Sequence, residues 1–301
     1  MRKKHQLSSI AILIPYFGKW PFWIELFVES CKRNPTIDWF FFSDCGRLDS
    51  FSENIKYQNV TFKEYKSLVS SKLSIDFDPS SAYKLCDIKP AFGFIHEDLI
   101  LNYDFWGFGD LDLVYGDLRT LYTEKYLSKF NLYSNHATRV SGHLCLLRNT
   151  KEMRNIFRKI PKWQDKFSNQ LHMAIDEKDF SRIFVKHKNL PNSLRRILKY
   201  IYPLSRRSDF VESYTTPNGC IAWHDGSYSF PDKWFWFDGV IKNSSSIEYY
   251  YPYFHFAVWK KENWIKNVEH LLVKYNCNMC YLFDEDGIEE VESFERYKKK
   301  N

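Results

Sequence analysis

The sequence contains little glycine and no glycine-rich phosphate loop. Only 11 of its 301 residues are glycine, and they form neither a GxGxxG pattern nor a Walker loop. Those patterns depend on glycine because the backbone N–H groups must approach a phosphate closely. The sequence therefore lacks the main support for a dinucleotide-binding domain or a P-loop enzyme.

Long apolar runs and dense cysteine are also missing. No stretch approaches the roughly 18 uncharged apolar residues that a membrane-spanning helix requires. Residues 1–18 begin basic and turn apolar, but the apolar run is short and no A-x-A cleavage pattern follows it. The 7 cysteines are scattered and odd in number, which is typical of a reducing compartment. We expect a cytoplasmic protein with at most peripheral contact to the inner face of the membrane.

Aromatic residues, in contrast, are abundant. The chain has 26 Phe, 20 Tyr and 10 Trp, which together make up 19% of its residues. Such rings fill a core or offer flat surfaces on which sugar rings stack. The net charge of +6 mildly favours anionic partners such as phosphates.

The N-terminal part has the pattern of a parallel α/β sheet. Residues 9–17 form an isoleucine-rich apolar run, residues 20–34 have helical periodicity, and residues 38–42 form a second aromatic run. Strand, helix and strand in this order predict a right-handed parallel unit. Ligands of such sheets bind beyond the carboxyl ends of the strands, so we expect Tyr16, Phe17 and Asp44 to face a common crevice.

The strongest chemical signal is a pair of carboxylates directly after a buried strand. Asp110 and Asp112 follow an aromatic run in WGFGDLDLVYGD, residues 106–117. In an extended segment, residues i and i+2 point to the same side. Two carboxylates placed in this way can engage one hard cation, Mg or Mn, which neutralises a diphosphate leaving group. A solvated turn is the alternative for such a triplet.

Inversion at a sugar's anomeric carbon would also need a base to take the proton of the attacking hydroxyl. Asp176 and Glu177 lie in HMAIDEKDF, within residues 169–183, which have helical periodicity. We favour Asp176, with Glu177 as the alternative and with His224 and Asp225 as a second choice. Two acids on a helix surface are the competing interpretation, and retention of the anomeric configuration stays possible.

These features together resemble a glycosyltransferase of the GT-A fold. In that fold a DxD motif binds the metal and the donor diphosphate, and several families add a C-terminal histidine as a ligand. Here PYFHFAVWKK, residues 252–261, is similar to the H-x-x-G-x-K-P-W ending of glycogenin-like and lipopolysaccharide galactosyltransferases. The resemblance implies that His255 is a metal ligand and that Lys260 contacts the diphosphate. Ala257 and Val258 depart from the usual glycine-containing spacer.

A closer resemblance covers nearly the whole chain. The motifs YxKxCDxKP, GxGDxDxxxGD, SGHxxLxRN and a WHDG-to-FHF tail are similar to those of bacterial polysaccharide-locus proteins of the galactofuranosyltransferase type. The resemblance suggests UDP-galactofuranose as the donor and an O-antigen or capsule glycan as the product. It implies donor-binding roles for a set of residues: Tyr16 and Asp44 at the uridine, Lys84, Asp87 and Lys89 at the ribose or diphosphate, and Gly142 and His143 beneath the donor sugar.

We therefore expect an α/β protein of the GT-A fold, with a mostly parallel central sheet, helices on both faces and a loop-rich, partly helical C-terminal region. Residues 1–150 would form the nucleotide-sugar-binding half of a single domain, 151–262 the acceptor-binding and catalytic half, and 263–301 a C-terminal helix and tail. The basic, apolar segment from Arg195 to Arg207 suits either an anionic membrane surface or a plain amphipathic helix.

The leading hypothesis is a metal-dependent enzyme that transfers a sugar from a UDP-sugar to an oligosaccharide or lipid-linked glycan. A nucleotidyltransferase or sugar pyrophosphorylase would share the sheet and the metal, but IPYFGKWPF, residues 14–22, has a single glycine where such enzymes carry a glycine-rich loop. A non-catalytic glycan-binding module would not require paired carboxylates. The alternating aromatic motifs of RNA-binding strands are missing, so we expect no nucleic-acid partner.

Overall fold

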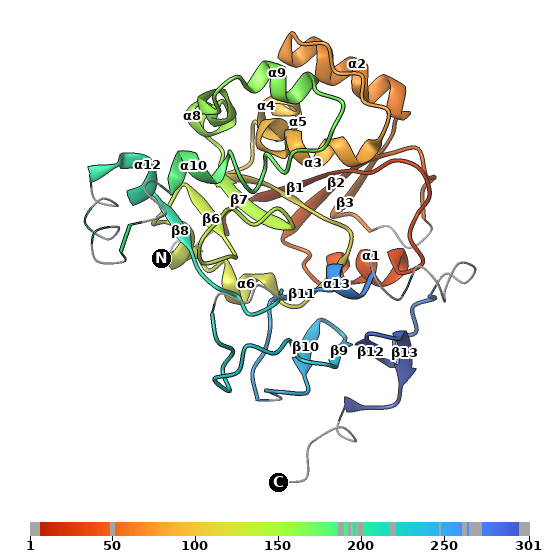
Figure 1. The fold of residues 1–301 in the computed structure, drawn as a ribbon. Helices are drawn as coiled ribbons and strands as arrows, with labels where there is room; N and C mark the ends of the chain where they lie inside the picture. Colours follow the sequence, from red (N-terminus) through yellow and green to blue (C-terminus); the bar gives the residue numbers. More distant parts are fainter. Residues whose placement is uncertain are drawn as a thin grey trace, which may run out of the picture.

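The computed structural model describes residues 7–48, 52–185, 190–191, 194, 197, 201–216, 221–246, 248–260, 264 and 273–294. A seven-stranded sheet lies at its centre, accompanied by a four-stranded sheet and a two-stranded ribbon (Figure 1).

The central sheet begins with the parallel unit that the sequence predicts. Its strands are β1 (Ile10–Pro15), β2 (Ile37–Ser43), β3 (Ile55–Asn59), β4 (Phe105–Gly109), β6 (Leu132–Ser134), β7 (Leu144–Arg148) and β8 (Ser208–Phe210). They are ordered β3-β2-β1-β4-β7-β6-β8. The first four are parallel, β7 is antiparallel to β4 and β6, and β8 is parallel to β6. The sheet is therefore mostly parallel, as expected.

Both faces of the central sheet are covered by helices, because its strands are apolar on both sides. Ala11 and Leu13 of β1 pack into one core, and Ile10, Ile12 and Ile14 pack into the other. Figure 1 shows α2, α8 and α9 on one side and α1 and α6 on the other. The α/β fold with helices on both faces is confirmed.

The helices on the first face are α2 (Phe62–Leu73), α3 (Leu85–Ile88), α4 (Phe92–Ile95), α5 (Glu97–Ile100), α8 (Lys151–Arg154), α9 (Trp163–Ser168) and α10 (Ser181–Phe184) with the 3-10 turns η1 (Ala82–Lys84), η2 (Lys89–Ala91) and η3 (Ile156–Lys159). Those on the second are α1 (Ile24–Lys32), α6 (Leu118–Leu121) and α7 (Glu124–Leu127). The short helix α12 (Pro203–Arg206) precedes β8. No helix among the residues described above is long and apolar enough to cross a bilayer.

The four-stranded sheet has an aromatic core of its own. It is ordered β10 (Val240–Asn243), β9 (Trp234–Phe237), β12 (Cys280–Asp284) and β13 (Gly287–Val291). Trp234 and Trp236 of β9 are completely buried together with Tyr281 and Phe283 of β12. The Trp236 Nε1 group donates a hydrogen bond to the Tyr115 carbonyl at 2.8 Å, which ties this core to the ribbon. Much of the aromatic content is thus core.

The ribbon joins distant parts of the chain. It consists of β5 (Leu113–Tyr115) and β11 (Tyr253–His255), which pair antiparallel, and the short helix α13 (Ala257–Trp259) follows it. Strand β5 comes directly after the Asp110 to Asp112 turn that follows β4. The pairing carries the C-terminal motif to that turn.

The helix expected over residues 169–183 is wrong. Apart from α10, this segment is an irregular turn in which Ala174 has a φ of 53°. The buried Asp87 carboxylate accepts hydrogen bonds from the Met173 and Ile175 backbone N–H groups at 2.8 and 2.9 Å. These donors are satisfied by a side chain, so they do not contribute to a helical ladder.

Two expected helical segments lie partly outside the described residues. In the basic segment from Arg195 to Arg207, residues 195, 196 and 198–200 are not described. In the C-terminal helix expected from residue 263 onward, residues 263 and 265–272 are not described. The membrane contact assigned to the first segment stays a prediction.

The close approach of β4 and β7 gives a stability prediction. A Cβ added at Gly107 would lie 2.5 Å from the Cys145 carbonyl oxygen. Because that neighbour is backbone in a paired strand, we expect Gly107→Ala to lower the free energy of unfolding by about 2–3 kcal/mol in urea titrations. Gly226→Ala is the control, since its Cβ meets no atom within 4 Å and only its φ of 81° carries a cost, about 1 kcal/mol. Equal stability of Gly107→Ala and the wild type would contradict the tight packing.

Candidate functional site

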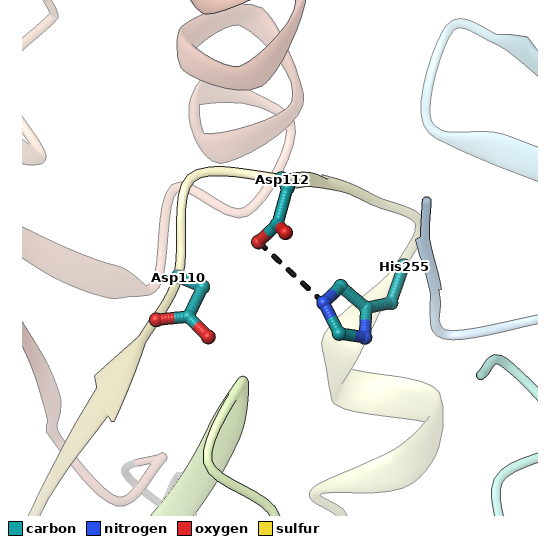
Figure 2. A group of neighbouring side chains, drawn as sticks. All are labelled: Asp110, Asp112 and His255. Atoms are coloured by element: carbon teal, nitrogen blue, oxygen red, sulfur yellow. Dashed lines mark ion pairs between the residues drawn. The ribbon is translucent and has the colours of Figure 1, made fainter. Parts of the chain in front are cut away.

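The structure brings together the three residues predicted as metal ligands. Asp110 and Asp112 lie in the turn between β4 and β5, and His255 ends β11, opposite Leu113 of β5. One ligand atom from each residue lies within 4.8 Å of the others, and Figure 2 shows the three side chains converging from these two segments. We call these three residues the carboxylate–histidine centre.

The donor atoms of this centre suit a divalent cation. Two carboxylates and one imidazole form a ligand set that Mn binds well, and the carboxylates also suit Mg. The Nε2 atom of His255 lies 3.5 Å from Asp112 Oδ1 (Figure 2), while its Nδ1 atom is 3.2 Å from the hydroxyl of Thr216. A hydrogen bond to the second ring nitrogen orients a histidine ligand and sets its tautomer. The residues present therefore fit a metal ion.

The imidazole ring of His143 packs against that of His255. The two imidazole rings are stacked with centroids 4.3 Å apart, and His143 Nε2 is 2.9 Å from the Tyr253 hydroxyl. Burial lowers the pKa of His143 well below its ordinary value, and the neighbouring His255 lowers it further. A neutral ring can lie against His255 without charge repulsion. In this structure His143 supports the His255 ring.

Each carboxylate of the centre has a lysine of its own. Lys260 Nζ lies 2.8 Å from Asp112 Oδ2, and Lys89 Nζ lies 2.5 Å from Asp110 Oδ1. Burial acts to raise the pKa of Asp112, but His255 and Lys260 outweigh it and hold the pKa well below its ordinary value. Burial likewise acts to lower the pKa of Lys89, but Asp110 keeps that pKa raised. Asp112 and both lysines are thus charged at neutral pH.

Asp176 joins this site through Lys89. The ammonium group of Lys89 lies 3.8 Å from Asp176 Oδ2 and donates to the Gly142 carbonyl at 2.9 Å. Asp176 is only 4% exposed, and burial raises its pKa to about 7 although Lys89 acts to lower it. A Cβ at Gly142 would come within 2.7 Å of Asp176 Oδ2, so glycine lets the two segments meet.

The alternative bases have other partners than Lys89. Glu177 is partly exposed, with its carboxylate 3.5 Å from the guanidinium group of Arg139. His224 and Asp225 occupy an exposed turn, where Asp225 accepts a hydrogen bond from the Ser227 N–H at 2.9 Å. Asp176, in contrast, contacts Lys89 of the site.

The motif YKLCDIKP divides into two parts. Lys84 and Asp87 are buried, with exposures of 1% and 0%, and their charged groups are 2.8 Å apart. Lys84 also donates to the carbonyls of Lys166 and Leu171 at 2.9 and 2.8 Å, while Asp87 holds the turn that precedes Asp176. Their contacts support the Asp176 segment, whereas Lys89 reaches the carboxylates.

The ends of β1 and β2 lie as the parallel unit predicts, with one exception. Tyr16 stacks on Trp20 with centroids 5.5 Å apart, and the exposed Asp44 accepts a hydrogen bond from the Gly18 N–H at 3.0 Å. Burial raises the pKa of Tyr16, and the charges of Lys260 and Asp112 also act on it, so this end adjoins the carboxylates. Phe17 is buried in the core against Tyr65, so its ring does not face the expected crevice.

Sequence reasoning missed Thr216. Its hydroxyl lies 3.2 Å from His255 Nδ1 and 3.4 Å from His143 Nε2, so it connects both imidazoles. A threonine in a loop has no periodicity or spacing that would mark it. Only the folded chain shows that the Thr215 carbonyl also accepts the His255 backbone N–H at 3.1 Å.

These residues combine three chemical capacities. The carboxylate–histidine centre can hold a divalent cation, the two lysines can contact an anion beside it, and Asp176 can accept a proton near neutral pH. These three capacities suit a site that binds a phosphate ester or diphosphate and activates a hydroxyl.

The raised pKa of Asp176 predicts how stability depends on pH. With a folded-state pKa of about 7 against an ordinary 3.8, the folded protein binds more protons than the unfolded chain between these values. The free energy of unfolding should therefore fall as the pH rises from about 4 to 7. We expect Asp176→Asn to remove this loss and to stabilise the protein at pH 8 by about 1–3 kcal/mol in urea titrations. Glu177→Gln, at a partly exposed carboxylate, is the comparison and should change stability little; lower stability of Asp176→Asn at pH 8 would contradict the assignment.

Among solved structures, similar chains include three glycosyltransferases. GlyE of Streptococcus pneumoniae TIGR4 is 14% identical with a TM-score of 0.33, over 69% of this chain and 46% of GlyE. The galactosyltransferase LgtC, in complex with donor and acceptor sugar analogues, is 10% identical with a TM-score of 0.35, over 68% and 74% of the two chains. A glycosyltransferase involved in the glycosylation of the major capsid of PBCV-1 is 11% identical with a TM-score of 0.34, over 69% and 84%. The chain spans less than half the length of GlyE.

A comparison with models of protein families shows to which family the chain belongs. No curated protein matches the sequence significantly. The model of the family of unknown function DUF6625 matches residues 12–279, which include the carboxylate–histidine centre and Asp176. The chain therefore belongs to the DUF6625 family.

Proposed function

We propose that the protein is a metal-dependent glycosyltransferase that moves a sugar from a UDP-sugar to a glycan acceptor. The observation that carries the proposal is the carboxylate–histidine centre beyond the carboxyl end of β4, at the edge where open parallel sheets bind ligands. Asp110, Asp112 and His255 would hold the cation. A divalent cation supplies charge that stabilises a diphosphate as it leaves.

The lysines complete the diphosphate site. Lys260, directly after α13, contacts Asp112 and its side chain is partly exposed, so its ammonium can turn toward a phosphate without leaving the centre. Lys89 is buried and holds Asp110 toward the cation. Together with a divalent cation, the two lysines would give the site a net positive charge, which favours binding of a diphosphate over binding of a neutral sugar.

The nucleoside would lie at the ends of β1 and β2. Tyr16 offers an aromatic ring, and the exposed Asp44 carboxylate can accept a hydrogen bond from a base N–H. The uridine assignment and the choice of UDP-galactofuranose rest on the resemblance of the YKLCDIKP, GDLDLVYGD and SGHLCLLRN motifs to those of galactofuranosyltransferase-type proteins. An O-antigen or capsule glycan as the acceptor rests on the same resemblance.

Asp176 would act as the base. As the acceptor oxygen attacks the anomeric carbon, Asp176 takes its proton, the bond from that carbon to the diphosphate oxygen breaks, and the configuration inverts. A base works best when its pKa is near the operating pH, and burial brings the pKa of Asp176 to about 7. Lys84, Asp87 and Gly142 position the carboxylate through the segment that carries it.

Metal-dependent nucleotide binding is the first test. In calorimetry with UDP, we expect wild-type protein to bind in the presence of Mn and much more weakly in its absence. Asp112→Asn should weaken binding of UDP with Mn at least about tenfold, because it removes a charged ligand. Asp117→Asn is the matched control from the same motif, since Asp117 caps α6 and asparagine caps equally well. Binding that ignores Mn, or an unchanged Asp112→Asn, would contradict the proposal.

The base is tested by the pH dependence of turnover. We expect a screen of UDP-, GDP- and TDP-sugars with Mn to reveal hydrolysis of a UDP-sugar, UDP-galactofuranose among those tried. Because Asp176 must be ionised, kcat/KM should fall about tenfold per pH unit below about 7. Asp176→Asn should lower kcat by about 10²–10⁴ while UDP still binds. Full turnover in Asp176→Asn together with loss in Glu177→Gln would move the role to Glu177.

A further inference from the structure

Three rings lie against one another at the surface of the molecule. His224 is parallel to Tyr249, with centroids 4.2 Å apart and an interplanar angle of 8°. The ring of Tyr214 is tilted by 39° against His224, with a centroid distance of 4.2 Å. We call Tyr214, His224 and Tyr249 the ring stack. Beneath it lie the buried rings of Tyr251 and Trp234, which belong to the aromatic core of the small sheet.

The ring stack is open to solvent on its outer side. Tyr249 is 50% exposed. Tyr250, the next residue, is 71% exposed, and Tyr228, which lies four residues after His224, is 65% exposed. Lys242 Nζ lies 4.9 Å from the centroid of the Tyr250 ring. Of these rings, Tyr214 packs against the core of the small sheet, whereas Tyr249 and Tyr250 are at least half exposed.

Local backbone structure holds the ring stack in place. The turn that carries His224 is closed by hydrogen bonds from the Trp223 N–H to the Ser227 carbonyl at 2.7 Å and from the Ser227 N–H to Asp225 at 2.9 Å. Tyr214 has a φ of 55°, a conformation that costs energy for a residue with a side chain. Rings fixed before a ligand arrives lose little conformational freedom on binding.

The ring stack is connected to the carboxylate–histidine centre by short stretches of chain. Tyr214 is two residues from Thr216, whose hydroxyl contacts His255, so their Cα atoms are at most about 7 Å apart. The Thr215 carbonyl, between them, accepts the His255 backbone N–H at 3.1 Å. The ring stack is thus joined directly to the segment that holds His255.

We propose that the ring stack and Tyr250 bind the acceptor glycan at sugar units beyond the one that reacts. Sugar rings have an apolar C–H face and a rim of hydroxyls, and this surface pairs aromatic faces with the tyrosine hydroxyls and the Asp225 carboxylate. The inference rests on the proposed function for the identity of the glycan as an acceptor. The binding surface itself is defined by the rings alone.

Saturation-transfer NMR with the full-length chain tests the surface. The probes are free tri- and tetrasaccharides of galactose, glucose, mannose and N-acetylglucosamine. We expect at least one to bind the wild type, Tyr249→Ala to weaken it about 3–10-fold, and Tyr249→Phe, which keeps the ring, to bind nearly as well as the wild type. Tyr250→Ala should act in the same direction. Phe237→Ser, at an aromatic residue of β9 that is 39% exposed and outside the ring stack, is the control and should bind as the wild type does.

Calorimetry with UDP and Mn on the same proteins separates this inference from the proposed function. If UDP binds with Mn but none of the sugars binds the wild type, or Tyr249→Ala and Tyr250→Ala bind them as tightly as the wild type, the surface is not a glycan site and only this inference fails. If the sugars bind through Tyr249 while UDP does not bind, the glycan surface stands and the transferase proposal fails.

Discussion

The antiparallel pairing of β5 with β11 is the contact on which the candidate site depends. It joins residues 113–115 to residues 253–255 and sets His255 opposite Leu113, one residue from Asp112. The pairing is held on its other side by the hydrogen bond from Trp236 to the Tyr115 carbonyl. Without it, Asp110 and Asp112 would be two carboxylates at the end of a strand, with neither His255 nor Lys260 beside them.

Charge balance explains why so many ionised groups can be buried in one place. Asp112 is matched by Lys260, the partly exposed Asp110 by Lys89, and Asp87 by Lys84. An unpaired buried charge would cost several kcal/mol, whereas a paired one with good geometry costs much less. Asp176 is the exception, because Lys89 is 3.8 Å away and already bound to Asp110. Burial therefore raises the pKa of Asp176 to about 7 although Lys89 acts to lower it, and the carboxylate is suited to accept a proton at neutral pH.

Sequence reasoning succeeded where the chemistry follows from local pattern. The run before Asp110, the two-residue spacing to Asp112 and the strand, helix and strand at the N-terminus lead directly to β4, β1, α1 and β2. It failed at residues 169–183, where helical periodicity was present. There the carboxylate of Asp87, far away in sequence, accepts hydrogen bonds from two backbone N–H groups. It also could not separate Lys84 from Lys89, since both stand in one motif and only packing buries one among carbonyls and directs the other to Asp110.

The sequence by itself determined the α/β class, the parallel N-terminal unit and the position of the paired carboxylates, because each depends on the period of apolar residues within a short segment. The tertiary structure alone decided that Phe17 belongs to the core, that Thr216 and His143 hold His255, and that Asp176 is the acid with a pKa near 7. Those properties depend on burial and on which distant side chains come within a few ångströms. Neither is set by the neighbours of a residue along the chain.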